Sequence, residues 1–499
     1  VYQLSHAHAW CLHLLIPYTR PRAFLLQGQM SNPTRQDGTS GSLEDPPVEC
    51  ESSAAELIER IGFGCGQLKV LFSGGGCWLA DGAELLLLSS VTGAVADEWD
   101  LDRWERGLIT SIVFIGVFAG NLISGYIGDQ LGRRAPLLLS YVGICAFSLL
   151  SVLATGFYSI TFFRFFVGAS FGIGQPAFNA LVGETTPAAF RVTMNAMAQM
   201  LFSAGELYSA VLIMLQDPNM QDLNWRKLVC WGAMPSFIFL LLALFFLQES
   251  PAWLQVSERQ EEARRALEDL ARANGAQHHV LTQWVPRRAS VSTSSTMDRI
   301  NVVFSRHLLY STVVVCVSVF TLNFLFYGGL YAFPQVLPKM DLHINPSMNL
   351  IVGALSEVPG YFIGIFLGSI LSRKTCMLIY LLMMIASTLM FGIAGSMILS
   401  TELGNWLEVT LQAGLIGQKI FTAFGFLIVY VYSIEIYPTV ARATGGALCI
   451  AAGRLGSIVA PTIFENLHYL TASHSSFFSF TAGLCGVNAM LVLFLPYET

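Results

Sequence analysis

Charged side chains are scarce in this sequence. Asp, Glu, Lys and Arg make up 12% of its 499 residues, whereas about 25% is usual in soluble domains. The net charge of -6 shows no basic excess, so no nucleic-acid partner is expected. Because so few charged groups are available to cover a water-exposed surface, lipid is the expected solvent of this chain.

Motifs for cofactors, metals and nucleotides are also lacking. The ten cysteines lie mostly in apolar stretches and form no C-x-x-C pair, which argues against a disulfide framework or a zinc site. The sequence has no P-loop, so no ATP-driven process is indicated. We expect no cofactor, no metal and no enzymatic chemistry.

Apolar residues account for 54% of the chain and are grouped into twelve long windows. Each window approaches or exceeds the about 20 residues that a helix needs to cross a bilayer. The sequence therefore predicts an all-α membrane protein with twelve transmembrane helices. The expected spans are residues 70–96, 107–128, 135–155, 157–181, 192–214, 227–247, 307–331, 348–371, 375–398, 408–434, 443–465 and 475–495.

Two longer polar stretches divide the chain into four parts. We expect a disordered cytoplasmic tail over residues 1–68, a six-helix bundle over 69–247, a cytoplasmic loop over 248–306 and a second six-helix bundle over 307–495. The tail has no basic region before its short apolar run, so a cleaved signal peptide is not expected, and Met30 is a candidate start. In the central loop, a charged segment that ends near Gly275 is expected to form a short helix.

The distribution of basic residues predicts the orientation. Of the 27 Lys and Arg residues, most fall in the tail and in the loops on the same side. The loops on the opposite side hold only Arg103, Arg106, Arg226, Lys227 and Lys339. By the positive-inside rule, both termini are expected in the cytoplasm.

An internal repeat supports two homologous bundles. The pattern E-x-x-P-x-x-x-R runs from Glu184 to Arg191 after the fourth span and again from Glu435 to Arg442 after the tenth. These positions are equivalent in two six-helix halves. Membrane transport proteins are commonly built from such repeats, with the solute site at the repeat interface.

A second motif lies between the second and third spans. It reads G-x-x-x-D-x-x-G-R-R and consists of Gly125, Asp129, Gly132, Arg133 and Arg134. This pattern resembles that of the major facilitator superfamily. The glycines permit a tight turn, and Asp129 is expected to lie against a helix N-terminus or to pair with a base of the other bundle. The equivalent place after the eighth span has Ser369 instead of the acid. The contact made by Asp129 is therefore expected to act as a latch on one side only, without a counterpart in the second half.

A more specific resemblance covers roughly residues 56–495, to the synaptic-vesicle-2-related proteins in the organic-ion and sugar-porter branch of that superfamily. The residues that carry it are Ile61–Gly64, Trp78–Glu84, Arg164 with Gly168, Gly172 and Gly174, Asn323, Tyr327–Gly328, and Tyr430–Thr439. The segment Glu249–Leu254 resembles the family pattern P-E-S-P-R-W-L, from which Gln248 and Ala252 depart. The resemblance implies twelve helices and alternating access.

Away from their ends, the predicted spans contain seven charged side chains, and by rise per residue these share one layer near the middle of the bilayer. Charges at that depth are costly, so they usually face a cavity or each other and mark function. Polar stripes with Trp78, Asn323 and Tyr327 converge on the same layer. The seven charged residues are Asp81, Glu84, Arg164, Glu206, Glu357, Lys419 and Arg454.

Structural alternatives exist for several of these residues. Arg164 could form a static pair with Glu206 or Asp81 that only locks the first bundle. Glu357 could face water on the outer side. Trp78, Tyr327 and Tyr331 could be packing residues. Gly168 and Gly172 fit helix packing better than solute contact, and we assign gating to the pairs Glu184 with Arg191 and Glu435 with Arg442.

These patterns predict a secondary active transporter of a small charged organic solute. Alternatives are a sugar porter, a pore, or a non-transporting binding or trafficking protein of the same fold. The expected partners are the solute, protons and the lipid bilayer, and the expected form is a monomeric multi-pass protein of the plasma or a vesicle membrane.

Energy coupling is expected to involve Asp81 and Glu84, because two carboxylates so close together in a cavity should not both ionise easily. We assign Asp81 as the partner of Arg164 and Glu84 as the proton carrier. In the central loop, Ser290 follows two bases, Arg287 and Arg288, and is a candidate phosphorylation site.

Overall fold

The computed structural model describes residues 50–276, 284–286, 296–340, 342–398, 405–438, 441–471 and 473–495. Most of the tail, including Met30, and the Ser290 segment lie outside these ranges. Within them, twelve helical segments are long and apolar enough to cross a membrane. This confirms the predicted number of spans.

The first six spans are α3 (Cys65–Gly74) continued by α4 (Gly76–Trp99), α5 (Arg103–Leu131), α6 (Arg134–Val152), α7 (Phe157–Thr185), α8 (Arg191–Gln216) after the 3-10 turn η1 (Ala188–Phe190), and α9 (Trp225–Gly232) continued by α10 (Met234–Phe246). The last six are α14 (Leu309–Val336) with the turn η3 (Leu337–Lys339), α15 (Pro346–Ile370), α16 (Arg373–Ile398), α17 (Asn405–Glu435), α18 (Arg442–Thr471) and α19 (Ser475–Leu493). The first span begins at Cys65, earlier than predicted.

Shorter elements are α2 (Ala54–Ile61), α11 (Pro251–Val256), α12 (Gln260–Ala273), α13 (Thr296–Val303), and two strands, β1 (Cys50–Ser52) and β2 (Trp284–Pro286), which pair in parallel. The predicted helix of the central loop is present as α12, and Gly275 follows it at a φ of 69°. In a bilayer a helix satisfies its own backbone groups, so the spans are built from helices, with one-residue breaks at Gly75 in the first span and Ala233 in the sixth.

The spans end on two opposite sides of the molecule. The motif end is where α5 ends at Leu131 and α6 begins at Arg134, and the far end is where α4 ends at Trp99 and α5 begins at Arg103. At the far end, Asp102 and Glu105 form a capping box that starts α5. At the motif end, Gly132 stops α5 with a φ of 90°, a conformation that glycine adopts without strain.

Both halves use the same close helix pairs. In the first half α5 packs against α7 and α4 against α8, and in the second half α15 packs against α17 and α14 against α18. A Cβ at Gly172 would lie 2.2 Å from the backbone oxygen of Val117, and one at Gly360 would lie 2.3 Å from that of Ile420. These glycines let the helix backbones touch, which bears out the packing interpretation of Gly172.

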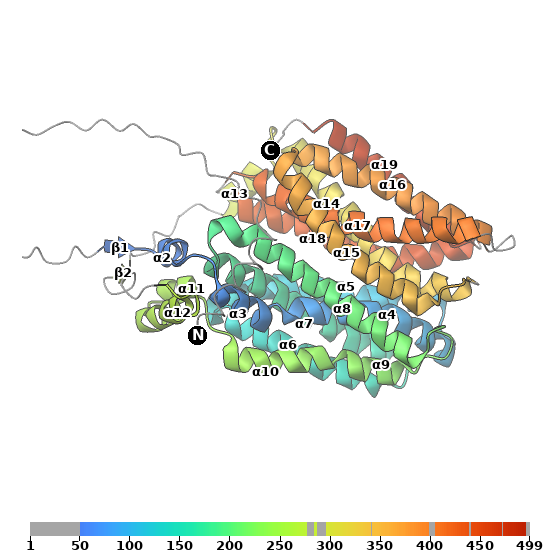
Figure 1. Cartoon of the computed structure of the whole chain (residues 1–499), viewed down its shortest axis with the longest axis horizontal. Coiled ribbons are helices and arrows are strands. Elements are labelled where there is room, and N and C mark those ends of the chain that lie inside the picture. Colours follow the sequence, from blue (N-terminus) through green and yellow to red (C-terminus); the bar gives the residue numbers. More distant parts are fainter. Residues whose placement is uncertain are drawn as a thin grey trace, which may run out of the picture. The chain divides into compact units, whose positions relative to one another are not determined.

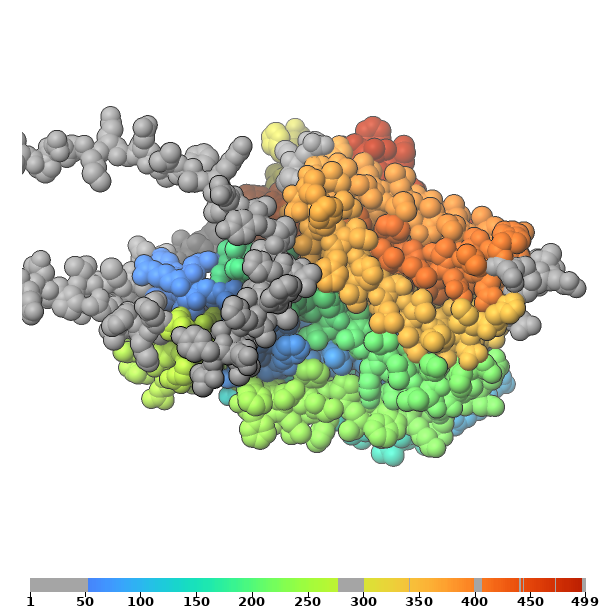
Figure 2. All heavy atoms as spheres, viewed as in Figure 1, coloured from blue at the N-terminus to red at the C-terminus, as the bar shows by residue number. Residues whose placement is uncertain are grey.

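The two halves meet along two main helix pairs, α5 with α18 and α8 with α15, and α4 also contacts α14. Figure 1 shows the first half in blue to green and the second in yellow to red. The surface in Figure 2 shows the orange α15 against the green α8. The candidate site lies on the helices of this interface.

A small helical cap lies at the motif end of the first half. Apolar side chains of α2, among them Leu57 and Ile58, bury against Leu267 and Leu270 of α12 (Figure 1). Residues 54–68 are therefore helical over most of their length, which corrects the expectation that the whole stretch 1–68 is disordered. Ser53 caps α2 and Glu56 bonds back to its backbone, a pairing that stabilises helix starts.

Candidate functional site

The seven charged side chains that the sequence places near the middle of the spans are all buried. Each is at most 7% exposed. Four are carboxylates and three are cations, so the charges do not cancel when all are ionised. The hydrogen bonds and ion pairs arrange them in three groups.

The first group is an ion pair inside the first half. Arg164 on α7 donates to Glu84 on α4 at 2.7 Å, and both side chains are almost fully buried. This corrects two sequence-based expectations, because Arg164 pairs neither with Asp81 nor with Glu206. Glu84 is therefore not a free carboxylate, which corrects its assignment as the proton carrier.

The second group joins the two halves. Gln175 on α7 donates from its amide nitrogen to Asp81 on α4 at 2.6 Å, and its amide oxygen accepts from Arg454 on α18 at 2.7 Å. Arg454 also donates to the hydroxyl of Tyr327 on α14 at 3.3 Å. One chain of hydrogen bonds thus runs from Asp81 in the first half to Tyr327 in the second.

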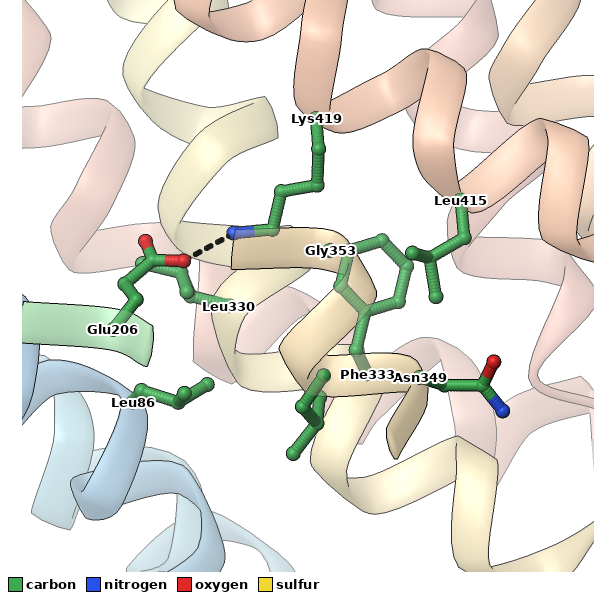
Figure 3. Close-up of a pocket in the computed structure, with 9 residues that line it drawn as sticks. Leu86, Glu206, Leu330, Phe333, Asn349, Gly353, Leu415 and Lys419 are labelled. Atoms are coloured by element: carbon green, nitrogen blue, oxygen red, sulfur yellow. Dashed lines mark hydrogen bonds and ion pairs between the residues drawn. The ribbon is translucent and has the colours of Figure 1, made fainter. Parts of the chain in front are cut away.

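The third group also joins the halves, and Figure 3 shows its central pair. Lys419 on α17 donates to Glu206 on α8 at 2.6 Å and to Glu357 on α15 at 2.8 Å. Ser203 of α8 donates to the second oxygen of Glu357. Glu357 is fully buried, which corrects the alternative that it faces water. We call Glu206, Lys419 and Glu357 the triad.

A small cavity adjoins the triad. Glu206 and Lys419 line it together with Leu86, Leu330, Phe333, Asn349, Leu350, Gly353 and Leu415, most of which Figure 3 labels. It has room for about one water molecule. In this conformation the triad is therefore closed off from an organic solute.

Of the remaining predicted polar residues, Asn323 and Trp78 lie apart from these groups, whereas Tyr327 belongs to the second. Asn323 bonds to the hydroxyl of Tyr430 at 3.2 Å and to the backbone of its own helix. Trp78 is half-buried, and its ring nitrogen has no hydrogen-bond partner among the described residues. Tyr327, besides contacting Arg454, packs against Phe114, with ring centroids 4.7 Å apart and the ring planes tilted by 58°.

The gating residues form pairs within each half. Arg133 bonds to Glu184 at 3.0 Å and to Asp129 at 3.2 Å in the first half. Arg373 bonds to Glu435 at 3.1 Å in the second. The pKa of Arg133 is raised, since partial burial lowers it but hydrogen bonds and charge attraction from Glu184 outweigh that effect.

These contacts correct the predicted pairs Glu184 with Arg191 and Glu435 with Arg442. Arg191 donates instead to the backbone oxygen of Thr186 at 3.2 Å. Asp129 is exposed and bonds to Arg133 rather than to a base of the other half. The pair of Arg133 with Glu184 has a counterpart in Arg373 with Glu435, but the Asp129 contact has none, because Ser369 donates to the backbone oxygen of Phe366 instead.

Arg134 and Gly132 lie against another side chain of the first half. Glu249 accepts from the backbone nitrogens of Arg133 at 2.6 Å and Arg134 at 3.1 Å. A Cβ at Gly132 would lie 2.2 Å from a Glu249 oxygen, whereas one at Gly125 would meet nothing within 4 Å. The motif thus anchors the turn between α5 and α6 to the chain after α10.

Hydrogen bonds that join the halves are concentrated at mid-span and at the far end. At the far end, Ser347 donates to the backbone oxygen of Pro218 at 2.8 Å and Gln221 to that of Pro338 at 3.2 Å. Ser89 of α4 donates to the backbone of Tyr331 at 2.7 Å. At the motif end, the ion pairs of the described residues stay within one half. The far end is therefore the closed side in this conformation.

The sequence places Gln175 and Ser203 in polar stripes on the fourth and fifth spans but does not assign them to the site, because they carry no charge. Tyr361 was missed altogether. Gln175 links Asp81 to Arg454, and Ser203 lies 3.4 Å from the Tyr361 hydroxyl. Their position in polar stripes on α7 and α8 is the signal that identifies Gln175 and Ser203.

Comparison with known proteins agrees with this architecture. Residues 86–499 match the family described as sugar (and other) transporter. The synaptic vesicle 2-related protein of Xenopus laevis is 28% identical over 491 residues, which cover 93% of this chain and 84% of that protein. Organic cation/carnitine transporter 7 of Arabidopsis thaliana is 26% identical over 486 residues, covering 89% of this chain and 94% of the relative.

Solved structures give the same fold. The xylose transporter XylE from E. coli, in a partially occluded inward-open conformation, superimposes with a TM-score of 0.69 at 16% identity, over 87% of this chain and 98% of that one. The similarity to synaptic-vesicle-2-related proteins that the motifs indicate is confirmed. Since the family match covers most of its length, the chain belongs to the sugar (and other) transporter family.

Proposed function

We propose that this multi-pass membrane transporter carries a small charged organic solute by alternating access, and that a proton moves with the solute. The observation that carries the proposal is the layer of buried charges at the interface of the halves. Two of its three groups join one half to the other through hydrogen bonds. A solute that binds there must compete with these bonds.

The polarity of the layer favours an ionic solute. Arg454 is held by two neutral groups, Gln175 and Tyr327, so its positive charge has no direct carboxylate partner among the described residues. A solute carboxylate could replace Gln175 at the guanidinium, which binds such groups through two parallel hydrogen bonds. The amide released from Arg454 would remain bound to Asp81.

A neutral sugar is the second candidate, because the family description and the XylE neighbour name sugars. Sugar sites use amides and hydroxyls, and this layer contains some, such as Gln175 and Tyr327. Its centre, however, consists of seven charged side chains, which a neutral solute would leave without a new partner. A non-transporting protein would have little reason to keep them, since each is costly in a membrane.

The host membrane is also part of the proposal. One set of relatives is named after synaptic vesicles, which supports an intracellular vesicle membrane for this chain. Both termini are proposed to lie on the cytoplasmic side, as the basic loops indicate, and the transporter is proposed to act as a monomer.

Uptake by purified protein in liposomes tests the solute class. The panel is labelled glutarate, tetraethylammonium, carnitine and xylose, which represent an anion, a cation, a zwitterion and a neutral sugar. We expect uptake of at least one charged compound and its loss in Arg454→Ala. Arg264→Ala on the exposed face of α12 is the control, because its partner Glu268 lies on the same helix. Uptake confined to xylose and unchanged in Arg454→Ala would contradict the proposal.

A further inference from the structure

The triad contains more negative than positive charge and is divided between the halves. Glu206 belongs to the first half, whereas Lys419 and Glu357 belong to the second. Each carboxylate is almost fully buried, and one ammonium serves both. A buried charge that loses its partner is strongly unfavourable. Any movement that separates the halves therefore requires that one carboxylate, which would lose its counter-ion, be neutralised.

The bonding pattern identifies which carboxylate that is. Glu357 has a partner on both oxygens, Lys419 on one and Ser203 on the other. Glu206 bonds to Lys419 through one oxygen, and its other oxygen has no hydrogen-bond partner among the described residues. When α8 moves away from α15 and α17, Lys419 stays with Glu357 as a neutral pair, and Glu206 is left alone.

The other ionisable groups around Glu206 do not remove this deficit. Tyr361 of α15 lies near Ser203 and carries no positive charge. On α4, Asp81 is bound to Gln175 and Glu84 to Arg164. Among the described residues, Lys419 is the cation that forms an ion pair with Glu206.

We propose that Glu206 binds the proton whose movement is coupled to the change between the two conformations, with Lys419 as the counter-ion that protonation releases. This inference rests on the proposed transport function and names the coupling site within it. The Glu206 carboxylate takes one proton from water and becomes neutral. Lys419 keeps its charge, because Glu357 still balances it. The ion pair between the halves becomes a weaker neutral contact, and the halves can separate without exposing a lone charge to the membrane interior.

The position of the cavity supports this assignment. It adjoins Glu206 and Lys419 and is also lined by Asn349, which lies in the first turn of α15 at the far end. The cavity has room for about one water molecule beside the ion pair, and that water can donate the proton to Glu206. Lys419 is held in addition by the face of Phe326, 5.4 Å from its nitrogen, which stabilises a cation.

Distance measurements between spin labels test the site without knowledge of the solute. Labels at Tyr126 of α5 and Ile434 of α17 report the separation of the halves at the motif end, and both positions are exposed. The full-length protein, with its native cysteines replaced, is measured in lipid nanodiscs between pH 5 and 9. We expect two distance populations whose ratio changes with pH by up to about tenfold per unit, the limit for one linked proton.

Four variants separate the possible outcomes. Glu206→Gln should give the low-pH distribution at every pH, and Glu206→Asp, which keeps a titratable group, should restore the pH response. Glu357→Gln leaves Glu206 as the sole counter-ion of Lys419, so the pH response should move to lower pH without being abolished. The control Glu268→Gln on α12 should leave the response unchanged. A pH response that survives in Glu206→Gln, or that is absent from the unmodified sequence, would overturn the proposal.

The same variants separate this inference from the proposed function. If the unmodified protein transports a charged solute but Glu206→Gln responds to pH as before, the coupling site is wrong and the function stands. If none of the four labelled compounds moves in liposomes, the proposed function is contradicted, and a pH response that depends on Glu206 would still assign the proton to this residue.

Discussion

Replacing Glu84 by Gln should destabilise the protein strongly, because Arg164 would keep its charge without a partner. The two side chains are 1% and 3% exposed and bond at 2.7 Å. Two further nitrogens of Arg164 have no hydrogen-bond partner among the described residues. No other acceptor in the described structure is therefore already in place to replace Glu84.

The expected cost follows from the burial of the pair. Removing one member of a buried ion pair costs about 3–5 kcal/mol, whereas removing both can be nearly neutral. The double variant Glu84→Gln with Arg164→Gln should therefore be more stable than Glu84→Gln alone. The exposed pair of Glu98 and Arg226, each 41% exposed, provides the matched control, because such pairs contribute at most about 1 kcal/mol.

The assay is a double-mutant cycle on denaturant unfolding in detergent micelles, with the uptake measurement made in parallel. We expect a large coupling free energy for Glu84 with Arg164 and a small one for Glu98 with Arg226. Equal stability of Glu84→Gln and the unmodified protein would refute the reasoning. If the double variant regains both stability and uptake, the pair only locks the first half, whereas recovered stability without uptake would give it a part in transport.

Three further predictions follow from packing, hydrogen bonds and one histidine. Gly172→Val should prevent close contact of α5 with α7 and reduce the yield of folded protein in size-exclusion chromatography, since the added Cβ would meet a backbone oxygen at 2.2 Å, whereas Gly125→Ala should be tolerated. Asn274→Ala should expose α2 to proteolysis, because the Asn274 side chain bonds Gly62, Gly66 and Gln67 at 2.7 to 2.9 Å; an unchanged cleavage pattern would contradict this. Burial and the charges of its neighbours lower the pKa of His474 to about 3. The stability of the protein should therefore fall as the pH drops below about 6.5, where the unfolded chain takes up a proton that the folded chain does not. His474→Phe should flatten this part of a profile of melting temperature against pH, and an equally steep profile would count against the prediction.

The spans could be predicted from the sequence because the length of an apolar run follows from bilayer thickness. The seven buried charges could be found for a related reason, since a charge in such a run is rare and costly. Both inferences depend only on position along the chain. They did not require knowledge of which helices are neighbours.

The pairing of the charges could not be predicted in the same way. Asp81 and Glu84 differ in depth by only about 4.5 Å, and the first span begins at Cys65 rather than at residue 70. That error in the start of the helix shifts the depth by more than the difference between the two residues. The partner of Arg164 therefore depends on helix rotation and tilt, which the sequence pattern does not specify.

The other incorrect predictions have different causes. The motif pairs of Glu184 and Glu435 with Arg133 and Arg373 connect separate helices, so spacing along one segment suggested the wrong partners. Helix α2 could have been predicted from Ser53 and Glu56, which form a capping box. The polar composition of the preceding residues obscured that local signal.

Accumulation of a charged solute against its concentration gradient tests the central claim most directly. Liposomes that contain the purified protein are given an inward proton gradient and the labelled compound that the panel identifies. We expect the internal concentration of the compound to rise above the external concentration, and this accumulation to be lost when a protonophore collapses the gradient. If the compound only equilibrates across the membrane, and a protonophore leaves its uptake unchanged, proton-coupled secondary transport by this chain is contradicted.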